Sequence, residues 1–253
     1  MNTVAAQPAR PDSANRPNRP DAPYRYYDLV LAGFVAVLLC SNLIGTAKVS
    51  EVSLPVIGAF AFGVGNIFFP ISYIFGDVLT EVYGYARARR VIWAGFMAMV
   101  FASVMAWAVV NLPASSTEPF NATLQPAIEV VFGNTWRIAV ASIAAFWVGD
   151  FVNAYVLARL KVLTRGRRLW LRTIGSTIVG QGVDSVIFYP LAFAGIWAGR
   201  TLLAVIAFNW FFKVMVEVVM TPLTYAIVGW LKRHEQVDYY DTNTNFTPFS
   251  LKD

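Results

Sequence analysis

The chain has 253 residues, of which 57% are hydrophobic and only 14% are charged, and its mean hydropathy is +0.53. Soluble domains of this length are about half apolar and about a quarter charged, so the composition excludes an ordinary soluble protein. The net charge of +5 comes from cations spread over separate segments, which argues against a nucleic-acid-binding surface.

The N-terminal segment, residues 1–27, contains five prolines, four arginines and few large apolar side chains. Such a segment has no core to contribute to, so we expect a disordered tail. It is not a signal peptide, because the apolar run that follows has full span length and further runs come after it.

Apolar runs long enough to cross a bilayer recur along the rest of the chain. They predict an all-α membrane protein with one transmembrane domain over residues 28–231 and a C-terminal tail over 232–253. The six expected transmembrane helices are 28–47, 66–85, 90–111, 136–158, 171–197 and 201–231. Between the first two, "SEVSLPVIGAFAFGVGN" is rich in β-branched residues, Gly and Pro, which favours a short hairpin or a re-entrant segment.

Basic residues alternate between the two sides of these helices. Sixteen lie in the N-terminal tail, after the second and fourth helices and after the last one, whereas the other three connections hold only Lys48, Arg137 and Arg200. The positive-inside rule therefore places both termini in the cytoplasm.

The sequence lacks the residues that several kinds of active site require. The single cysteine, Cys40, and the single histidine, His234, exclude a Cys/His zinc site and a histidine-based triad within the membrane. No phosphate-binding GxxxxGK[ST] pattern occurs. We therefore expect no enzyme, no metal and no cofactor, and energy from a gradient, a partner subunit or consumption of the product.

Charged and amide side chains nevertheless occur inside the apolar helices. Each intramembrane charge costs roughly 2.5–3.5 kcal/mol, so such residues mark functional sites by default. Asp77, Asp150, Asp184 and Glu217 each lie roughly 13–21 Å from a basic edge at the helical rise, near the middle of the bilayer. Acidic groups from four helices at one level predict a ligand site between the helices. The candidate substrate-binding residues are Asp77, Glu81, Asp150, Asn153, Gln181, Asp184, Asn209, Lys213 and Glu217.

Structural roles are the alternative for some of these residues. Lys213 and Glu217 are four apart and could neutralise one another, and Glu81 could reach toward the headgroups. Asp184 has no cation within a turn of its own helix and has Gln181 on the same face. We therefore expect Asp184 to be the principal acceptor for a polar ligand.

Four blocks carry a resemblance to a known family. The runs "FPISYIFGDVLTEVYGYARARRVIWAG", "FWVGDFVNAYVLARLK", "LRTIGSTIVGQGVDSVIFYPLAFAG" and "FKVMVEVVMTPLTYAIV" resemble the queuosine precursor transporters, which are related to vitamin-uptake membrane proteins. The D-x-x-x-E-x-Y-G and G-Q-x-x-D-S blocks are the most specific parts. The resemblance implies a multi-pass protein of the bacterial inner membrane that imports 7-deazaguanine bases for tRNA modification, with a small-molecule substrate and the lipid bilayer as its partners.

The residues leave other functions open. The chain could be the substrate-binding subunit of an ATP-driven complex with ATPase partner subunits, or a carrier of another polar metabolite. The Gly-Asp pairs in "FGDVL" and "VGDFV" could also form an intramembrane aspartyl protease, but that function would leave at least two other buried acids unexplained.

Overall fold

The computed structural model describes residues 24–43, 49–54, 58–63, 69–133 and 136–250. The described chain is mainly helical, with a π-helical turn, η3 (Leu79–Tyr83), that continues α2 directly. The helices are α1 (Tyr27–Leu43), α2 (Phe69–Val78), α3 (Tyr85–Asn111), α4 (Asn121–Phe132), α5 (Trp136–Leu163), α6 (Leu169–Phe193) and α7 (Gly199–Glu235).

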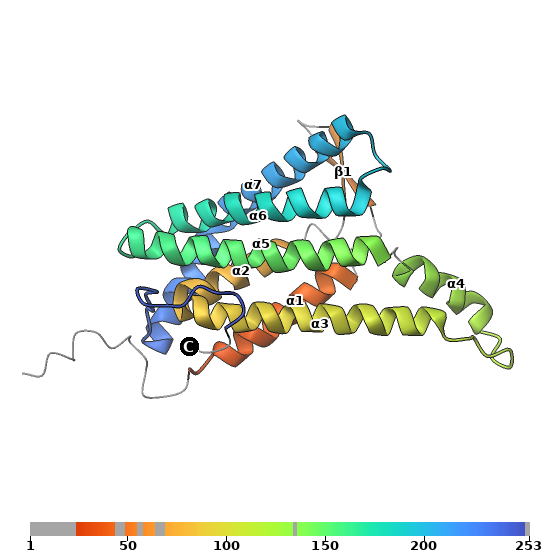
Figure 1. Ribbon diagram of the computed structural model, residues 1–253, viewed down its shortest axis with the longest axis horizontal. Coiled ribbons are helices and arrows are strands. Elements are labelled where there is room, and N and C mark those ends of the chain that lie inside the picture. Colours follow the sequence, from red (N-terminus) through yellow and green to blue (C-terminus); the bar gives the residue numbers. More distant parts are fainter. Residues whose placement is uncertain (1–23, 44–48, 55–57, 64–68, 134–135, 251–253) are drawn as a thin grey trace, which may run out of the picture.

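The long helices form one elongated bundle. In Figure 1, α3, α5 and α6 run side by side along the long axis of the molecule, and α7 crosses behind α6 at an angle. Helix α2 lies inside the bundle, where it contacts α1, α5 and α7. The polar residues of α2 are therefore surrounded by other helices instead of lipid.

Helix length and composition make this a membrane protein. Among the described residues, three helices are long and apolar enough to cross a bilayer, Tyr85–Asn111, Arg137–Leu163 and Gly199–Glu235, and the apolar helix Tyr27–Asn42 is shorter. The observed helices follow the six expected segments closely, although the number of membrane crossings stays a prediction.

A two-stranded hairpin lies between α1 and α2. Strands β1 (Val49–Leu54) and β2 (Gly58–Gly63) pair antiparallel, with Val49 opposite Gly63 and Leu54 opposite Gly58. This is the segment for which the sequence favoured a hairpin or a re-entrant segment.

The junction between α2/η3 and α3 differs from the prediction. We expected a basic loop after residue 85, but α3 begins at Tyr85, so the arginines of that segment lie in the first turns of a helix. The reversal is made by Gly84 alone, at φ 84° and ψ 167°, a conformation that is essentially restricted to glycine. A single residue thus replaces the expected loop.

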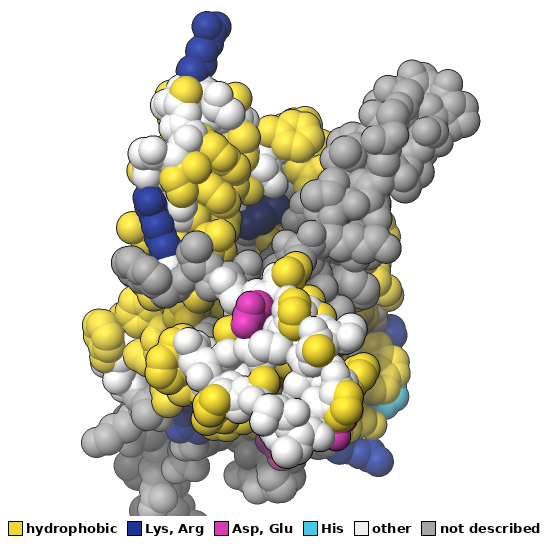
Figure 2. Space-filling view, turned by 90° about the vertical axis from the view of Figure 1, so that its right-hand side faces the viewer, with side chains coloured by type: hydrophobic (Ala, Val, Ile, Leu, Met, Phe, Trp, Pro, Cys, Tyr) yellow, Lys and Arg dark blue, Asp and Glu magenta, His cyan; other side chains and the backbone are white. Residues whose placement is uncertain are grey.

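Helix α4 was not predicted either. The connection between the third and fourth expected helices contains this 12-residue helix, which has no buried residue. Its length of about 18 Å at the helical rise is too short to cross a bilayer. Figure 2 looks onto the end of the molecule where α4 lies, and hydrophobic side chains cover large parts of it.

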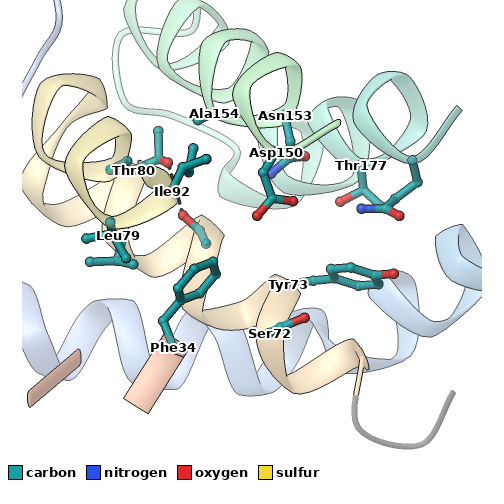
Figure 3. Close-up of a pocket in the computed structure, with 14 residues that line it drawn as sticks. Phe34, Ser72, Tyr73, Leu79, Thr80, Ile92, Asp150, Asn153, Ala154 and Thr177 are labelled. Carbon is teal, nitrogen blue, oxygen red and sulfur yellow. Dashed lines mark hydrogen bonds between the residues drawn. The ribbon is translucent and has the colours of Figure 1, made fainter. Parts of the chain in front are cut away.

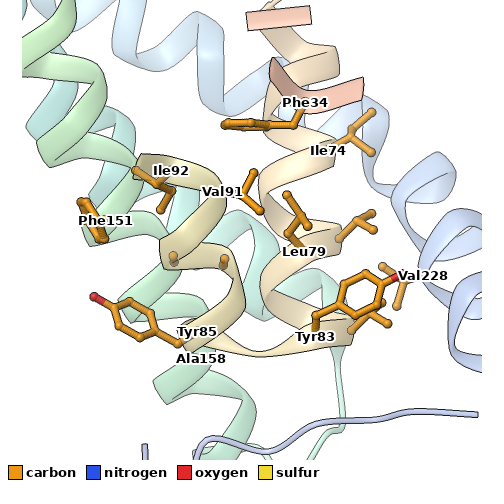
Figure 4. Packing of buried hydrophobic residues seen from close by; sticks show 14 of the residues in the cluster. Phe34, Ile74, Leu79, Tyr83, Tyr85, Val91, Ile92, Phe151, Ala158 and Val228 are labelled. Carbon is orange, nitrogen blue, oxygen red and sulfur yellow. The ribbon is translucent and has the colours of Figure 1, made fainter. Parts of the chain in front are cut away.

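The apolar core fills the space around α2, η3 and the start of α3. Phe34 from α1, Leu79 from η3 and Val91 from α3 are each at most 1% exposed. Figure 4 shows these side chains converging from the different helices, with Phe151 of α5 at the edge of the cluster. This packing holds α2 firmly against its neighbours.

Five helix ends meet at one end of the bundle, which we call the basic end: the starts of α1, α3 and α6 and the ends of α5 and α7. Tyr83 Oη donates to Glu235 Oε1 at 2.8 Å, and Tyr27 Oη donates to the Arg87 carbonyl at 3.1 Å. The rings of Tyr24 and Tyr27 pack edge-on against Tyr83. Residues 24–27 are therefore ordered, which shortens the expected tail, and residues 1–23 lie outside the described residues.

Residues 236–250, here called the C-terminal segment, lie across the basic end. Arg89 Nη1 donates to the carbonyls of Asn245 (2.8 Å) and Thr247 (2.7 Å), and Trp93 Nε1 donates to that of Pro248 (2.8 Å). Helix α7 also continues to Glu235, four residues beyond the predicted end. The tail predicted after residue 231 is thus partly helix and partly a packed segment.

Candidate functional site

A small polar cavity lies between α2, α5 and α6. Figure 3 shows Asp150 and Asn153 reaching into it from α5, with Ser72 and Tyr73 on the opposite side. Phe34 and Ile92 close it with apolar surface. Its volume is about 20 Å³, enough for about one water molecule. The polar side chains that line it are Ser72, Tyr73, Thr80, Asp150, Asn153, Thr177 and Gln181.

Glycines let α5 and α6 approach closely enough to form this cavity. A Cβ atom placed on Gly180 would lie 2.7 Å from Asn153 Cβ, and one placed on Gly149 would lie 2.9 Å from Asp184 Cβ. Neither distance is sterically acceptable, so any larger residue would push the two helices apart. The contact at Gly180 sets the position of Asn153.

The amide groups at the cavity have unsatisfied oxygens. Asn153 Nδ2 donates to Asp77 Oδ1 at 3.1 Å, but Asn153 Oδ1 has no hydrogen-bond partner. Gln181 is 4% exposed and its Oε1 also lacks a partner. Asp150 makes no hydrogen bond to the described part of the chain. Because a buried polar group without a partner costs about 1–3 kcal/mol, the two buried amide oxygens, together with the Asp150 carboxyl group at the same cavity, indicate a site for hydrogen-bond donors.

Asp184 is not the unpaired acid that the sequence suggested. Lys213 Nζ of α7 lies 2.5 Å from Asp184 Oδ2, and both side chains are 20% exposed. The expectation considered cations on the same helix only, whereas the partner comes from the neighbouring one. This ion pair also argues against the alternative that Lys213 neutralises Glu217. The hydroxyl of Tyr73 also lies beside the Lys213 ammonium group.

Asp77 and Glu217 form an acidic pair beside the cavity. They are 0% and 1% exposed, and their carboxyl groups lie against each other. Asp77 Oδ2 and Glu217 Oε1 have no partner among the described residues, and no cation of those residues forms an ion pair with either acid. The predicted acids of α2 and α7 therefore do meet, but next to the cavity lining.

Glu81 lies apart from the cavity, at the basic end. Its carboxylate accepts hydrogen bonds from Arg172 Nη2 (2.7 Å) and Nε (3.2 Å) and from Lys232 Nζ (2.7 Å). Lys161 Nζ lies 3.6 Å from Glu81 Oε1 and donates to the Glu81 carbonyl at 2.6 Å. Glu81 is fully buried, so the idea that it reaches toward the headgroups is wrong. It joins η3, α5, α6 and α7 through ion pairs.

The C-terminal segment extends this ionic cluster. Asp238 Oδ1 lies 2.6 Å from Lys161 Nζ and 2.8 Å from Lys232 Nζ. Burial alone would raise the pKa of Asp238, but the hydrogen bonds from the two lysines outweigh burial and hold this pKa below its usual value. The carboxylate is therefore charged over the physiological range.

Asn209, the last of the predicted residues, makes its hydrogen bond within its own helix. Its Nδ2 donates to the Val205 carbonyl of its own helix at 3.0 Å. It does not line the cavity.

Four cavity residues were missed by the sequence interpretation: Ser72, Tyr73, Thr80 and Thr177. The sequence spacing could have predicted two of them, because Tyr73 precedes Asp77 by four residues and Thr177 precedes Gln181 by four. Residues four apart share a helix face, so extending each polar stripe by one turn would have found both.

Comparison with known proteins identifies the family. The family model described as "Putative vitamin uptake transporter" matches residues 63–227. A "Probable queuosine precursor transporter" of Bacillus subtilis (strain 168) is 34% identical over 164 residues, which cover 64% of this chain and 69% of the relative. The "Queuosine precursor transporter" of Escherichia coli (strain K12) is 29% identical over 196 residues, covering 74% and 81%.

A third relative has a matching name. It is the "Probable queuosine precursor transporter" of Haemophilus influenzae (strain ATCC 51907 / DSM 11121 / KW20 / Rd), 25% identical over 172 residues, which cover 65% of this chain and 67% of the relative. The comparison with solved structures found no match. Because the family model covers more than half of the chain, the protein belongs to the vitamin-uptake-type membrane transporter family that includes these queuosine precursor transporters.

Proposed function

We propose that the protein imports queuosine precursors, the 7-deazaguanine bases, across the bacterial inner membrane. The names of three relatives support this substrate. The observation in the structure that carries the proposal is the set of unpaired acceptors around one cavity: the Asp150 carboxyl group, Asn153 Oδ1 and Gln181 Oε1. The function is transport of a small molecule and not catalysis.

The chemistry of the base fits these acceptors. A deazaguanine ring carries an N–H and an exocyclic amine side by side, which one carboxylate accepts as a bidentate pair. Its five-membered ring adds a further N–H donor, for which an amide oxygen is suitable. Asp150 is our choice for the bidentate contact, because Asp184 is already bound by Lys213. Tyr73 offers a ring against which the flat base can stack.

The base does not fit the cavity in the conformation that the structure shows, here called the closed form. A cavity of about 20 Å³ is far below the roughly 300 Å³ and more of typical ligand sites. The helices around α2 must separate to admit the substrate and close again during transport. In our proposal the protein has six membrane crossings with both termini in the cytoplasm, which the gathering of basic helix ends at one end supports.

Exchange across liposomes tests this function directly. Purified protein alone, without partner subunits, should exchange labelled 7-cyano-7-deazaguanine for unlabelled base. Gln181→Leu removes one acceptor and should lower the apparent affinity roughly fivefold or more, since the lost hydrogen bond is worth about 1 kcal/mol or more. Gln125→Leu on α4 is the matched control, because α4 has no buried residue.

Two results would oppose the proposal. Absence of exchange by the wild-type protein, together with unchanged tRNA queuosine in cells that depend on uptake, would reject the substrate. Normal affinity in Gln181→Leu at normal abundance would place the base elsewhere in the bundle.

A further inference from the structure

We propose that Asp77 and Glu217 form a proton-binding site, in which one proton is shared between the two carboxyl groups when the helices are closed. The inference rests on the proposed function only for its effect on transport. The proton site itself is a property of the folded protein.

The first argument is the geometry of the pair. The two carboxyl groups lie against each other, and each leaves one oxygen without a partner, Asp77 Oδ2 and Glu217 Oε1. Two ionised carboxylates offer only acceptors, so they repel one another and cannot hydrogen-bond. A single proton between them turns the repulsion into a hydrogen bond, as in other buried carboxyl pairs. The proton is therefore the smallest ligand that satisfies both orphaned oxygens.

The second argument is that the surrounding charges do not neutralise the pair. The other acids that act on Asp77 are Asp150 from α5, which adds negative charge, and Glu81 from η3, whose charge is balanced by its own cations. Lys213 on α7 is bound to Asp184 of α6. Three described cations at the basic end reach η3, but they bind Glu81 instead: Lys161, Arg172 and Lys232.

Helix α1 contributes no titratable side chain at this level. Tyr27 and Asp28 lie in its first turn, and Cys40 is exposed. Both acids of the pair are at most 1% exposed, so water does not compensate their charge. Two full negative charges in this place would be very costly, and binding one proton removes one of them.

Asn153 connects the proton site to the cavity. Its Nδ2 donates to Asp77 Oδ1 at 3.1 Å, while its unpaired Oδ1 belongs to the cavity lining. Opening the helices around α2 separates Asp77 from Glu217 on α7 and exposes both to water, so the proton is released. Closure takes it up again. The rate of exchange should therefore fall as the pH rises, because the closed form becomes harder to reach.

Infrared spectroscopy of the purified protein tests the proton directly, without any transport. At neutral pH the wild-type protein should show the carbonyl stretch of a protonated carboxyl group, and this band should disappear in both Glu217→Gln and Asp77→Asn. Glu129→Gln, which changes an acid on the exposed helix α4, is the matched control and should keep the band. A band that persists unchanged in both pair variants, or no band at all, would overturn the proposal.

The pH profile of exchange is the second test. Wild-type exchange should fall by up to about tenfold per pH unit above the pH at which the proton is lost. In Glu217→Gln the amide N–H supplies the hydrogen that the proton supplied, so its profile should stay flat within about twofold. An equally steep profile in this variant, or exchange that requires sodium ions at all pH values, would contradict the proton site. Failure of the wild-type protein to exchange at all would reject the proposed function and leave the infrared result to decide on the proton.

Discussion

Arg172 holds both carboxylate oxygens of Glu81, with Nη2 at 2.7 Å from Oε1 and Nε at 3.2 Å from Oε2. Both side chains are at most 1% exposed, and Lys161 and Lys232 add their charges to the same carboxylate. Four elements, η3, α5, α6 and α7, thus meet at one buried acid. This contact fixes the basic end of the bundle.

Removing the charge of Glu81 should destabilise the protein. Glu81→Gln leaves Arg172 and two lysines without their shared carboxylate, and breaking a buried ion pair costs about 3–5 kcal/mol. We expect lower membrane abundance and a lower Tm in detergent. Glu129→Gln, on the exposed helix α4, should change neither. Normal stability of Glu81→Gln with lost uptake would instead assign Glu81 to the substrate site.

The ion pair between Asp184 and Lys213 should show strong coupling between its members. Asp184→Asn leaves the lysine, and Lys213→Met leaves the acid, as an unpaired and largely buried charge. Each single variant should lose several kcal/mol of stability, of the order of 3–5 kcal/mol, whereas the double variant should recover at least half of that loss. The measurement is a double-mutant cycle on thermal unfolding. Simple additivity would show that the pair contributes nothing to the fold.

Sequence periodicity predicted most of the helices but not the geometry of the second one. Asp77 and Glu81 are four residues apart, and in an α-helix both would face one ligand. The chain forms a π-helical turn over Leu79–Tyr83, in which hydrogen bonds span five residues, so residues four apart no longer stack. Asp77 consequently faces Asn153, and Glu81 faces Arg172. Local patterns do not predict such a turn.

The pairing of charges between helices was equally hidden. The sequence places acids from four helices near one level, and the structure brings two of them, Asp77 and Glu217, together. The rotation of each helix about its axis decides which acid forms an ion pair with a cation, and this rotation cannot be predicted from the sequence. Asp184 therefore looked unpaired although Lys213 binds it.

Gly84 should be irreplaceable because of its backbone and its neighbour. Its φ of 84° with ψ of 167° disfavours any L side chain, and an added Cβ would overlap the ring of Tyr239. Gly84→Ala should lose about 1–3 kcal/mol from backbone strain alone. Gly229→Ala is the control, since it lies inside α7 with open space around it and should be neutral or gain up to about 1 kcal/mol. Equal Tm values for the two variants would contradict this account.

Asp238 should make the basic end sensitive to acid. Its pKa is lower in the folded protein than in the unfolded chain, so its contribution to stability is complete above the usual carboxyl pKa of about 3.9. That contribution is lost as the pH falls through the lower folded value. Wild-type protein should therefore lose Tm more steeply than Asp238→Asn as the pH falls below about 4. Because the side chain is 43% exposed, high salt should weaken the difference.

A substitution of Asp150 tests most directly which side chain binds the N–H edge of the base. It lines the cavity and makes no hydrogen bond to the described residues, so a ligand meets no competitor there. Asp150→Asn turns one acceptor oxygen into a donor amide that opposes the N–H edge of the base. Losing a charge-assisted contact of about 1.5–3 kcal/mol should weaken binding roughly tenfold to a hundredfold.

Comparing the cyano- and aminomethyl-substituted bases distinguishes two possible roles of Asp150. If Asp150 accepts the edge that all deazaguanines share, the cyano- and aminomethyl-substituted bases should lose affinity equally, as measured by inhibition of exchange. If Asp150 pairs with the aminomethyl cation instead, only that base should bind more weakly, and the assignment of the shared edge to Asp150 would be wrong. Glu118→Gln, in the exposed connection before α4, is the matched control and should bind both bases as the wild-type protein does.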